Sequence, residues 1–271
     1  MAIENFKPTI WKARLLSNLR KNHVFGQVVN DEYSGDISAA GDTVKIGGIG
    51  AISVSDYVPG TTNISYEELT DASTKLVVDQ YKYFAFKVDD IDTAQSNANE
   101  MDEAMDEASH ALIDASDNYI AGLWGDAATT VDNSDLTGDA FAEEECYETF
   151  AIIKQKLMEK NVPADFPLWV VVNPASYKNI LIDEIDTSTD NVSAMGQGAV
   201  TAAMGFDIYV SNNLVTNKCL AGTYRSIGFA EQILNTEALR LEGDFTDAVR
   251  GLYVYGAKVI RNDELVEIDI S

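Results

Sequence analysis

Three aspartates stand close together in the stretch FKVDDIDTAQ, residues 86–95. Carboxylate oxygens are the ligands that divalent cations such as Mg²⁺ prefer, so Asp89, Asp90 and Asp92 could hold a metal ion for phosphoryl or glycosyl chemistry. The same residues also suit the end of a strand and the start of a helix, because Asp accepts hydrogen bonds from the first free amides of a helix and its charge is favourable there. We expect the second role and retain the metal site as an alternative.

A second group of possible metal ligands surrounds His110. Asp106 precedes it by four residues and Asp114 follows it by four, so the three side chains share one face of a predicted helix. They could bind a cation. A single helix, however, leaves the rest of the coordination shell unsupplied, so we expect a solvated acidic face.

The chain carries none of the common catalytic motifs. It has no GxSxG, HExxH or GxxxxGK[ST] motif and no Cys/His quartet, and it contains two histidines in all. The run GGIG at residues 47–50 lacks the strand–GxGxxG–helix setting of a dinucleotide site, so it predicts a bent strand. Cys146 and Cys219 lie outside any CxxC motif and are expected to be buried free thiols. We therefore expect neither catalytic residues nor a cofactor.

The composition is that of a folded but very acidic protein. The 271 residues are 46% hydrophobic and 23% charged, with a net charge of −25, enough for one large domain or two small ones. Residues 88–153 contain 18 carboxylates and no Lys or Arg, whereas the first 25 residues carry a net charge of +4. Such a chain is a poor general binder of nucleic acid. It shows neither a signal peptide nor a membrane-spanning run.

Apolar spacing predicts helices and strands in an α+β arrangement. Residues 9–21 predict a short helix, and the spacing of apolar residues between 101 and 123 predicts a very long one, of about thirty residues. The apolar stripe of the long helix consists of Met101, Met105, Ala108, Leu112, Ala115, Tyr119 and Leu123. A further helix is predicted from the spacing of Cys146, Phe150, Ile153 and Leu157, and another one starting at Pro174.

Several stretches are rich in residues that favour strands. Residues 43–58 and 74–88 flank the turn PGTTN and form a long excursion that is too polar at its tip to pack wholly on its own domain. The remaining predicted strands are residues 168–172, 206–214, 224–230 and 251–270.

In this order, the elements resemble a known family. The segments are WKARLLSNLRKNHVFGQVVN, GDTVKIGGIG, VDQYKYFAFKVDDIDTAQ, the long acidic helix, VVVNPASYKNIL and GFDIYVSNNL. Together they are similar to the major capsid protein of tailed double-stranded DNA bacteriophages, which has the Johnson, or Hong-Kong-97-type, fold. The resemblance covers nearly the whole chain, and most members of that family have no catalytic site.

The resemblance implies a division of the chain into four parts. They are an N-terminal arm (1–40), an extended loop or E-loop (41–73), a peripheral domain with the long spine helix (74–126 and 239–271) and an axial domain (127–238). An arm and a hairpin that leave apolar groups and strand edges unsatisfied are expected to pack on neighbouring subunits. The expected contact residues in the arm are Lys7, Trp11, Lys12, Arg14, Leu15, Leu16, Arg20 and Lys21.

The resemblance also implies the function. It implies a structural protein, not an enzyme, that self-assembles through hexamers and pentamers into an icosahedral capsid shell around the phage DNA, which it encloses without sequence-specific binding. The implied partners are further copies of the chain, a portal, a separate scaffold protein and decoration proteins, with no membrane and no cofactor. The protein would be made in the host bacterial cytoplasm and reside in the virion.

Two alternatives remain open at this point. An encapsulin-like compartment of the same fold would hold a cargo enzyme instead of DNA and would need an interior pocket for a cargo peptide. A carboxylate metal enzyme would use Asp89, Asp90 and Asp92 and would form no shell.

Overall fold

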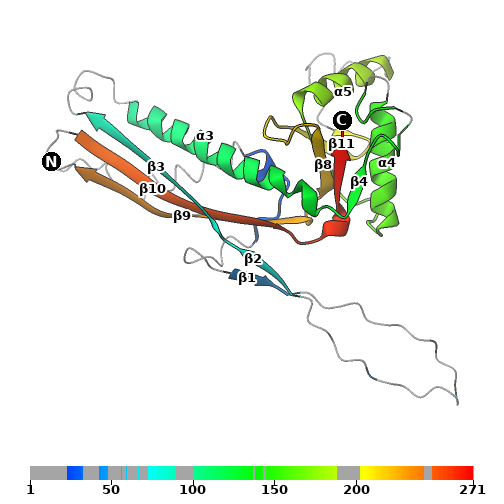
Figure 1. Ribbon diagram of the computed structural model, residues 1–271, viewed down its shortest axis with the longest axis horizontal. Helices are drawn as coiled ribbons and strands as arrows, with labels where there is room; N and C mark the ends of the chain where they lie inside the picture. Colours follow the sequence, from blue (N-terminus) through cyan, green and yellow to red (C-terminus); the bar gives the residue numbers. More distant parts are fainter. Residues whose placement is uncertain are drawn as a thin grey trace.

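The computed structural model describes residues 23–32, 43–47, 56, 59, 66, 73–89, 100–136, 138–142, 145–187, 202–240 and 246–270. These residues form a long three-stranded sheet with one long helix along it, and a compact lobe built on a six-stranded sheet (Figure 1). The predicted α+β class is thereby confirmed.

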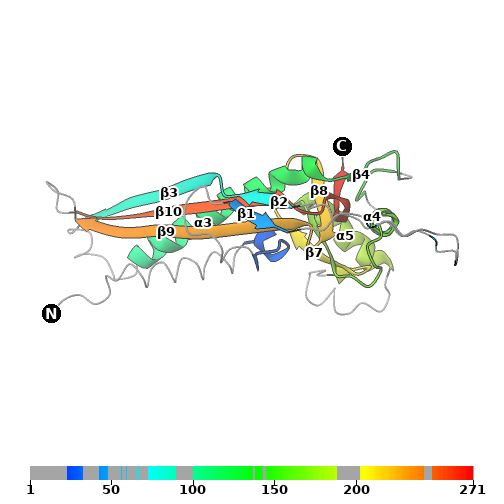
Figure 2. The ribbon, with the colours of Figure 1, turned by 90° about the horizontal axis from the view of Figure 1, so that it is seen from below.

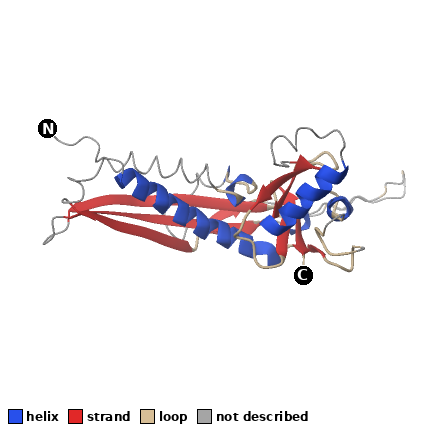
Figure 3. Ribbon diagram, turned by 90° about the horizontal axis from the view of Figure 1, so that it is seen from above, coloured by secondary structure: helices blue, strands red, loops and turns tan. Residues whose placement is uncertain are grey.

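The long sheet is antiparallel, in the order β3-β10-β9. β10 (Thr246–Val259) lies in the centre and pairs with both β3 (Gln80–Asp89) and β9 (Ile227–Arg240) along nearly their full lengths. The helix α3 (Glu100–Ala121) runs along one face of this sheet and continues as the 3-10 turn η3 (Gly122–Asp126) (Figures 1 and 3).

Side chains that alternate along the strands build the core under α3. Phe84 and Phe86 of β3 pack there with Val249, Tyr253 and Tyr255 of β10. Gly251 pairs with Phe84, and a Cβ at that position would lie 2.4 Å from the Phe84 ring. The aromatic ring therefore occupies the space that a side chain at residue 251 would need.

The opposite face of the long sheet is partly covered by a two-stranded ribbon. β1 (Thr43–Ile46) and β2 (Thr74–Val77) pair antiparallel and pack through Val44 and Leu76 against Ala230 and Val254 (Figure 2). We call this face, beyond the ribbon, the outer sheet surface; it is defined by Tyr81, Tyr83, Ala85, Arg250 and Leu252.

The lobe contains a mixed sheet in the order β4-β11-β8-β5-β7-β6. Its strands are β4 (Thr129–Val131), β5 (Leu168–Val172), β6 (Ala202–Ala203), β7 (Phe206–Val210), β8 (Lys218–Thr223) and β11 (Leu265–Asp269). The helices α4 (Cys146–Glu159) and α5 (Pro174–Thr187) pack on this sheet, and a short 3-10 turn, η4 (Asn262–Glu264), precedes β11. Another 3-10 turn, η1 (Phe25–Gln27), packs through Phe25 in the core under α3.

The sequence of β5 is a continuous apolar run because the strand lies between two cores. Leu168, Val170 and Val172 point to the core with α4 and α5, whereas Trp169 and Val171 point to the core with α3. Both faces of the strand are buried, so an alternating polar pattern would not suit it. The lobe sheet thus connects the two main cores of the molecule.

Most predicted elements are confirmed, with several differences. The predicted run 74–88 is divided into β2 and β3, β7 ends at Val210 and not at residue 214, and β4 and β8 were not predicted. The long helix becomes a 3-10 turn after Ala121, and residues 224–226 form a turn before β9 because Ser226 N–H and its hydroxyl both bond to the Thr223 carbonyl (3.0 and 2.7 Å). The predicted final strand is divided by η4 into β10 and β11. The predicted helix at residues 9–21 lies outside the described residues.

The predicted domain boundaries remain a prediction, but the strands can be placed against them. Residue 239 lies within β9, and β11 pairs with β4 and β8 in the lobe sheet, although residues 239–271 were predicted to be peripheral. The sheet topology therefore divides the chain near residue 227 and again near residue 260.

Candidate functional site

The three aspartates considered for metal binding are only partly within the described residues. Asp89 is the last residue of β3, as expected for a strand end, while Asp90 and Asp92 lie outside. Among the residues that the structure describes, no group of three or more His, Cys, Asp or Glu is arranged to hold a metal ion. The capping role of Asp92 stays a prediction.

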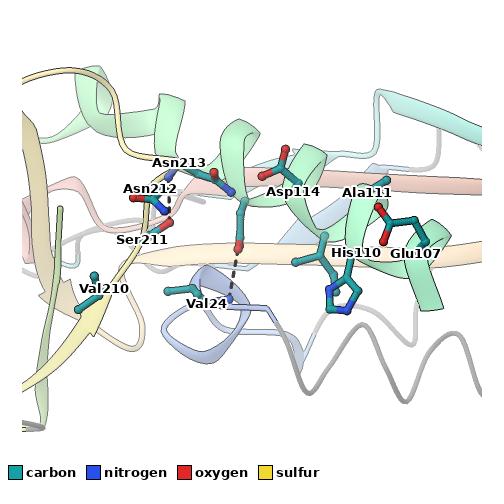
Figure 4. Close-up of a pocket in the computed structure, with 11 residues that line it drawn as sticks. Val24, Glu107, His110, Ala111, Asp114, Val210, Ser211, Asn212 and Asn213 are labelled. Atoms are coloured by element: carbon teal, nitrogen blue, oxygen red, sulfur yellow. Dashed lines mark hydrogen bonds between the residues drawn. The ribbon is translucent and has the colours of Figure 1, made fainter. Parts of the chain in front are cut away.

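His110 lies in a groove between α3 and the loop after β7 (Figure 4). The groove has a volume of about 560 Å³ and is lined by Val24, Glu107, His110, Ala111, Ile113, Asp114, Asp117, Val210, Ser211, Asn212 and Asn213. His110, Glu107 and Asp114 are exposed, and Asn118 donates to the backbone and side-chain oxygens of Asp114 (2.9 and 3.4 Å). This flank of α3 is therefore an acidic, solvated face.

The other histidine belongs to a buried polar cluster that the sequence reading missed. His23 Nε2 lies 2.7 Å from Ser116 Oγ, and His23 Nδ1 lies 2.8 Å from Asp117 Oδ1. Asp117 also accepts hydrogen bonds from the backbone N–H groups of Val24 (3.2 Å) and Phe25 (3.1 Å). The Asp117 carboxylate on α3 thus caps the 3-10 turn η1, although the two are distant in the sequence.

These three side chains have the order of a Ser-His-Asp triad, but they do not form a usable nucleophile. In such a triad the serine hydroxyl must reach a substrate. Ser116 is fully buried, and its hydroxyl donates to the Ile113 carbonyl of the same helix (2.9 Å). The arrangement therefore fastens the N-terminal segment to α3.

The cluster continues to the long sheet. The Tyr253 hydroxyl donates to Glu231 Oε2 (2.6 Å), and burial, followed by the nearby Glu231 carboxylate, raises the pKa of Tyr253 well above its usual value. A cavity of about 190 Å³ adjoins it, lined by His23, Gly26, Asp31, Phe229 and Glu231.

Both cysteines are buried free thiols, as predicted. Burial raises the pKa of the Cys219 thiol to about 11 and that of Cys146 further, with Asp183 adding to the effect at Cys146. A raised pKa keeps both thiols protonated near neutral pH, so neither is an activated nucleophile.

The outer sheet surface exposes two tyrosines among the described residues of the long sheet. Tyr83 is 79% exposed and Tyr81 is 49% exposed. A groove of about 500 Å³ runs beside Tyr83 and is lined also by Ala85, Glu237, Arg250, Gly251 and Leu252. Arg250 donates two hydrogen bonds to Glu237 Oε2 (2.6 and 3.0 Å) at its edge. Exposed aromatic surface next to a charged rim is typical of a protein–protein contact.

Comparison of the sequence with known families identifies the family of the chain. Residues 70–268 match the family described as phage capsid protein. The chain belongs to that family. This capsid protein is therefore a structural protein whose copies self-assemble into the shell of a phage virion.

Solved structures agree with this assignment. A protein of Mycobacterium phage Che8 is 30% identical, with a TM-score of 0.74 and 91% of each chain covered. The capsid of cyanophage P-SCSP1u is 16% identical, with a TM-score of 0.69 and coverage of 92% and 88%. A virus-like particle from Pyrococcus furiosus is 12% identical, with a TM-score of 0.61 and coverage of 98% and 100%. The last two share the fold, here the Hong-Kong-97-type capsid fold. A search of curated protein sequences finds no match.

Two further findings bear on the predicted sites. All eight arm residues that were expected to contact neighbouring subunits, from Lys7 to Lys21, lie outside the described residues, so those contacts stay a prediction. Among the helices that the structure describes, none is both long and apolar enough to cross a membrane.

Proposed function

We propose that this capsid protein forms an icosahedral shell of hexamers and pentamers around a double-stranded DNA genome, and that neighbouring copies exchange two segments. These are the N-terminal arm, residues 1–40, and the E-loop, residues 41–73. The family match supports the shell. The observation that carries the exchange is the exposure of Tyr81 and Tyr83 on the outer sheet surface, which no other described residues cover. In this scheme the long sheet with α3 is the peripheral domain and the lobe is the axial domain.

The arm is proposed to contact the acidic flank of α3 in a neighbouring copy. Opposite charge supports this pairing, because the first 25 residues carry +4 while residues 88–153 carry 18 carboxylates and no Lys or Arg. Exposed Glu107 and Asp114 supply part of that flank. The proposed contact residues are Lys7, Trp11, Lys12, Arg14, Leu15, Leu16, Arg20 and Lys21.

The E-loop is proposed to cover the outer sheet surface of a neighbouring copy. Residues 48–72 contain four carboxylates and no Lys or Arg, which complements Arg250 and the exposed Lys87 on this face. Within its own subunit, the ribbon β1–β2 packs on the half of the sheet around Ala230 and Val254. The other half, around Tyr83, is exposed among the described residues and is the proposed contact for a second copy.

The remaining parts of the proposal rest on the family. The protein would have no enzymatic activity, would assemble with a portal, a separate scaffold protein and decoration proteins, and would be made in the host cytoplasm. A net charge of −25 would keep the enclosed DNA from adhering to the wall, since like charges repel.

A cargo-holding compartment of the encapsulin type is the second candidate. Its support is the similarity in fold to the Pyrococcus furiosus virus-like particle over nearly the whole of both chains. The contents of shells purified from the natural host distinguish the two: DNA in a capsid, and a cargo protein in a compartment.

The exchange is tested by reversing one charge on the outer sheet surface. We expect Arg250→Glu to reduce shell yield severely, because it repels the acidic E-loop, while the subunit stays folded by circular dichroism. Lys258→Glu is the matched control, since Lys258 is exposed on the same strand but lies outside the groove. Shells are counted by electron microscopy and sedimentation. Equal shell yields from both variants would overturn the proposed E-loop contact.

A further inference from the structure

The turn between β6 and β7 carries a residue type that its backbone conformation disfavours. Ala203 pairs with Phe206. The two residues between them, Met204 and Gly205, form a hairpin loop in which both φ angles are positive, 50° and 87°. This is the pattern of a type I′ turn, where Asn-Gly is the preferred pair. Gly205 suits that geometry, whereas a left-handed backbone is unfavourable for methionine.

The other non-glycine residues of positive φ in the described part of the chain have local explanations. Two of them are Asn161 and Asn217, and asparagine tolerates this region of backbone space. Phe141 is buried in the lobe core, where its backbone N–H and its carbonyl both bond to side chains. Met204, in contrast, is 44% exposed. Strained residues that local packing does not explain are concentrated at functional sites.

Met204 lies at the edge of a groove on α4, the helix on the side of the lobe that faces away from the long sheet (Figure 1). We call it the lobe groove; it has a volume of about 520 Å³ and is lined by Ala151, Lys154, Gln155, Met158, Glu159 and Met204. Met158 is 50% exposed. Methionine is flexible and polarisable, and it is enriched in protein–protein contacts. Two exposed methionines in one groove therefore indicate a contact surface.

A lysine without an acidic partner adjoins the lobe groove. Lys154 Nζ donates to the Met204 carbonyl (3.4 Å), and no carboxylate in the described part of the subunit forms an ion pair with it. The chain has 44 acidic residues against 19 basic ones, so a second copy offers carboxylates on much of its surface. The groove therefore suits a segment of a second copy that brings a carboxylate next to Lys154.

The opposite flank of α4 offers such a segment. Lys154 and Lys156 are two residues apart and so point to opposite sides of the helix. Lys156 Nζ bonds to the Thr130 carbonyl (2.7 Å) and to the Asp135 carboxylate on its side. The loop after β4 that lies there also contains Asp132, which is exposed and forms no ion pair among the described residues. Two flanks of complementary charge fit a head-to-tail contact between copies, and contacts of that kind can close into rings.

We propose that the lobe groove is a contact between the lobes of neighbouring copies. It receives the loop after β4 of the next copy, with Asp132 of that loop beside Lys154. This contact rests on the proposed shell of hexamers and pentamers, and it is separate from the contacts of the arm and the E-loop. Met204 then lowers the stability of the free subunit through its backbone, and stabilises the assembled state by burying apolar surface.

Met204→Asn in the full chain separates these two effects. We expect the melting temperature of the free subunit to stay unchanged or to rise by up to about 3 °C, because Asn-Gly is the pair that the turn prefers. We also expect the subunit concentration at half-maximal assembly to rise about tenfold, as for the loss of one apolar anchor. Circular dichroism measures the first quantity and light scattering the second.

A second variant and a matched control come from the helices of the lobe. Met158→Gln removes the other methionine and keeps the helix propensity of the site, so it should weaken assembly in the same way. If Met204→Asn fails to fold, Met158→Gln alone decides. Ile182→Gln is the control, because Ile182 is an exposed apolar residue of α5 outside the lobe groove. It should assemble like the parent.

Exchange of the two charges tests which segment fills the groove. Lys154→Glu should weaken assembly, and adding Asp132→Lys to the same chain should restore most of the loss, because the pair is then reversed in every copy. Asp132→Lys alone should weaken assembly as well. A double variant that assembles no better than either single variant overturns the proposed pairing.

Each remaining outcome has a definite meaning. Normal assembly of both methionine variants overturns the contact. A melting temperature lowered by more than about 3 °C in Met204→Asn would show that the same subunit covers Met204. Shells that form normally but lose a second virion protein would assign the groove to that protein. A parent that forms no closed shells would overturn the proposed shell instead, and its smaller oligomers, measured by sedimentation, would still report the lobe contact through the same variants.

Discussion

His23 and Asp117 illustrate what residue-level patterns reveal and what they miss. The apolar spacing predicts the buried stripe of α3, and Met105 and Leu112 are indeed buried. The burial of Asp117 was not predicted, because a carboxylate in an acidic helix reads as solvated. Its burial depends on the backbone amides of Val24 and Phe25, which lie 93 and 92 residues away in the sequence. No local pattern contains that information.

Removal of the Asp117 carboxylate tests how much it contributes to the free energy of unfolding. We expect Asp117→Ala to lower the free energy of unfolding by about 2–4 kcal/mol, since it leaves buried backbone donors without a partner. Asp114→Ala, one turn earlier on the exposed face, should change it by less than about 0.5 kcal/mol. Urea unfolding of the free subunit measures both. Similar values for the two variants would mean that Asp117 does not anchor the 3-10 turn η1.

Elements were predicted well where one periodicity covers the whole segment. The helix α4 buries Cys146, Phe150, Ile153 and Leu157 at the predicted spacing, and α5 begins at Pro174. The strand pairing of the long sheet was harder to predict, because β10 pairs with β3 across more than 150 residues of sequence. Which strands become neighbours depends on such distant contacts, and so do the positions at which glycine is required.

The packing around two glycines predicts how replacing each of them by alanine changes the stability of the subunit. A Cβ at Gly256 would lie 2.3 Å from the Val77 backbone oxygen, whereas nothing lies within 4 Å of one at Gly122. We expect Gly256→Ala to destabilise the subunit by about 1–3 kcal/mol, because the ribbon β1–β2 must move away from β10. Gly122→Ala should be neutral or slightly stabilising. Thermal unfolding followed by circular dichroism compares the two, and a Gly256→Ala variant as stable as the parent would contradict the close approach.

At the scale of the whole molecule, the order of the elements was more informative than any one of them. No single segment identifies the fold, yet the succession of a strand pair, a long acidic helix and a buried LWVVV strand resembled a capsid protein, and the family match over residues 70–268 agrees. The division between the sheets was less predictable. The C-terminal strand β11 returns to the lobe, and its pairing with β4 and β8 is visible only in three dimensions.

The uneven charge of the whole chain leads to a prediction about assembly. Subunits of net charge −25 repel one another, and the Debye length falls from about 30 Å at 0.01 M salt to about 10 Å at 0.1 M. We therefore expect assembly to become easier across that range. Single exposed ion pairs contribute only about 0–1 kcal/mol, so the basic arm should act through the sum of its charges.

Replacing all five basic residues of the arm by Gln should then impair assembly in moderate salt without unfolding the subunit. The residues are Lys7, Lys12, Arg14, Arg20 and Lys21. The matched control removes five positive charges elsewhere, at Lys75, Lys82, Lys160, Lys178 and Lys258, and changes the net charge by the same amount. Light scattering follows assembly, and circular dichroism checks the fold. If both variants assemble equally, net charge alone controls the process. If the arm variant assembles like the parent and the parent ignores salt, the apolar face of the arm carries the contact.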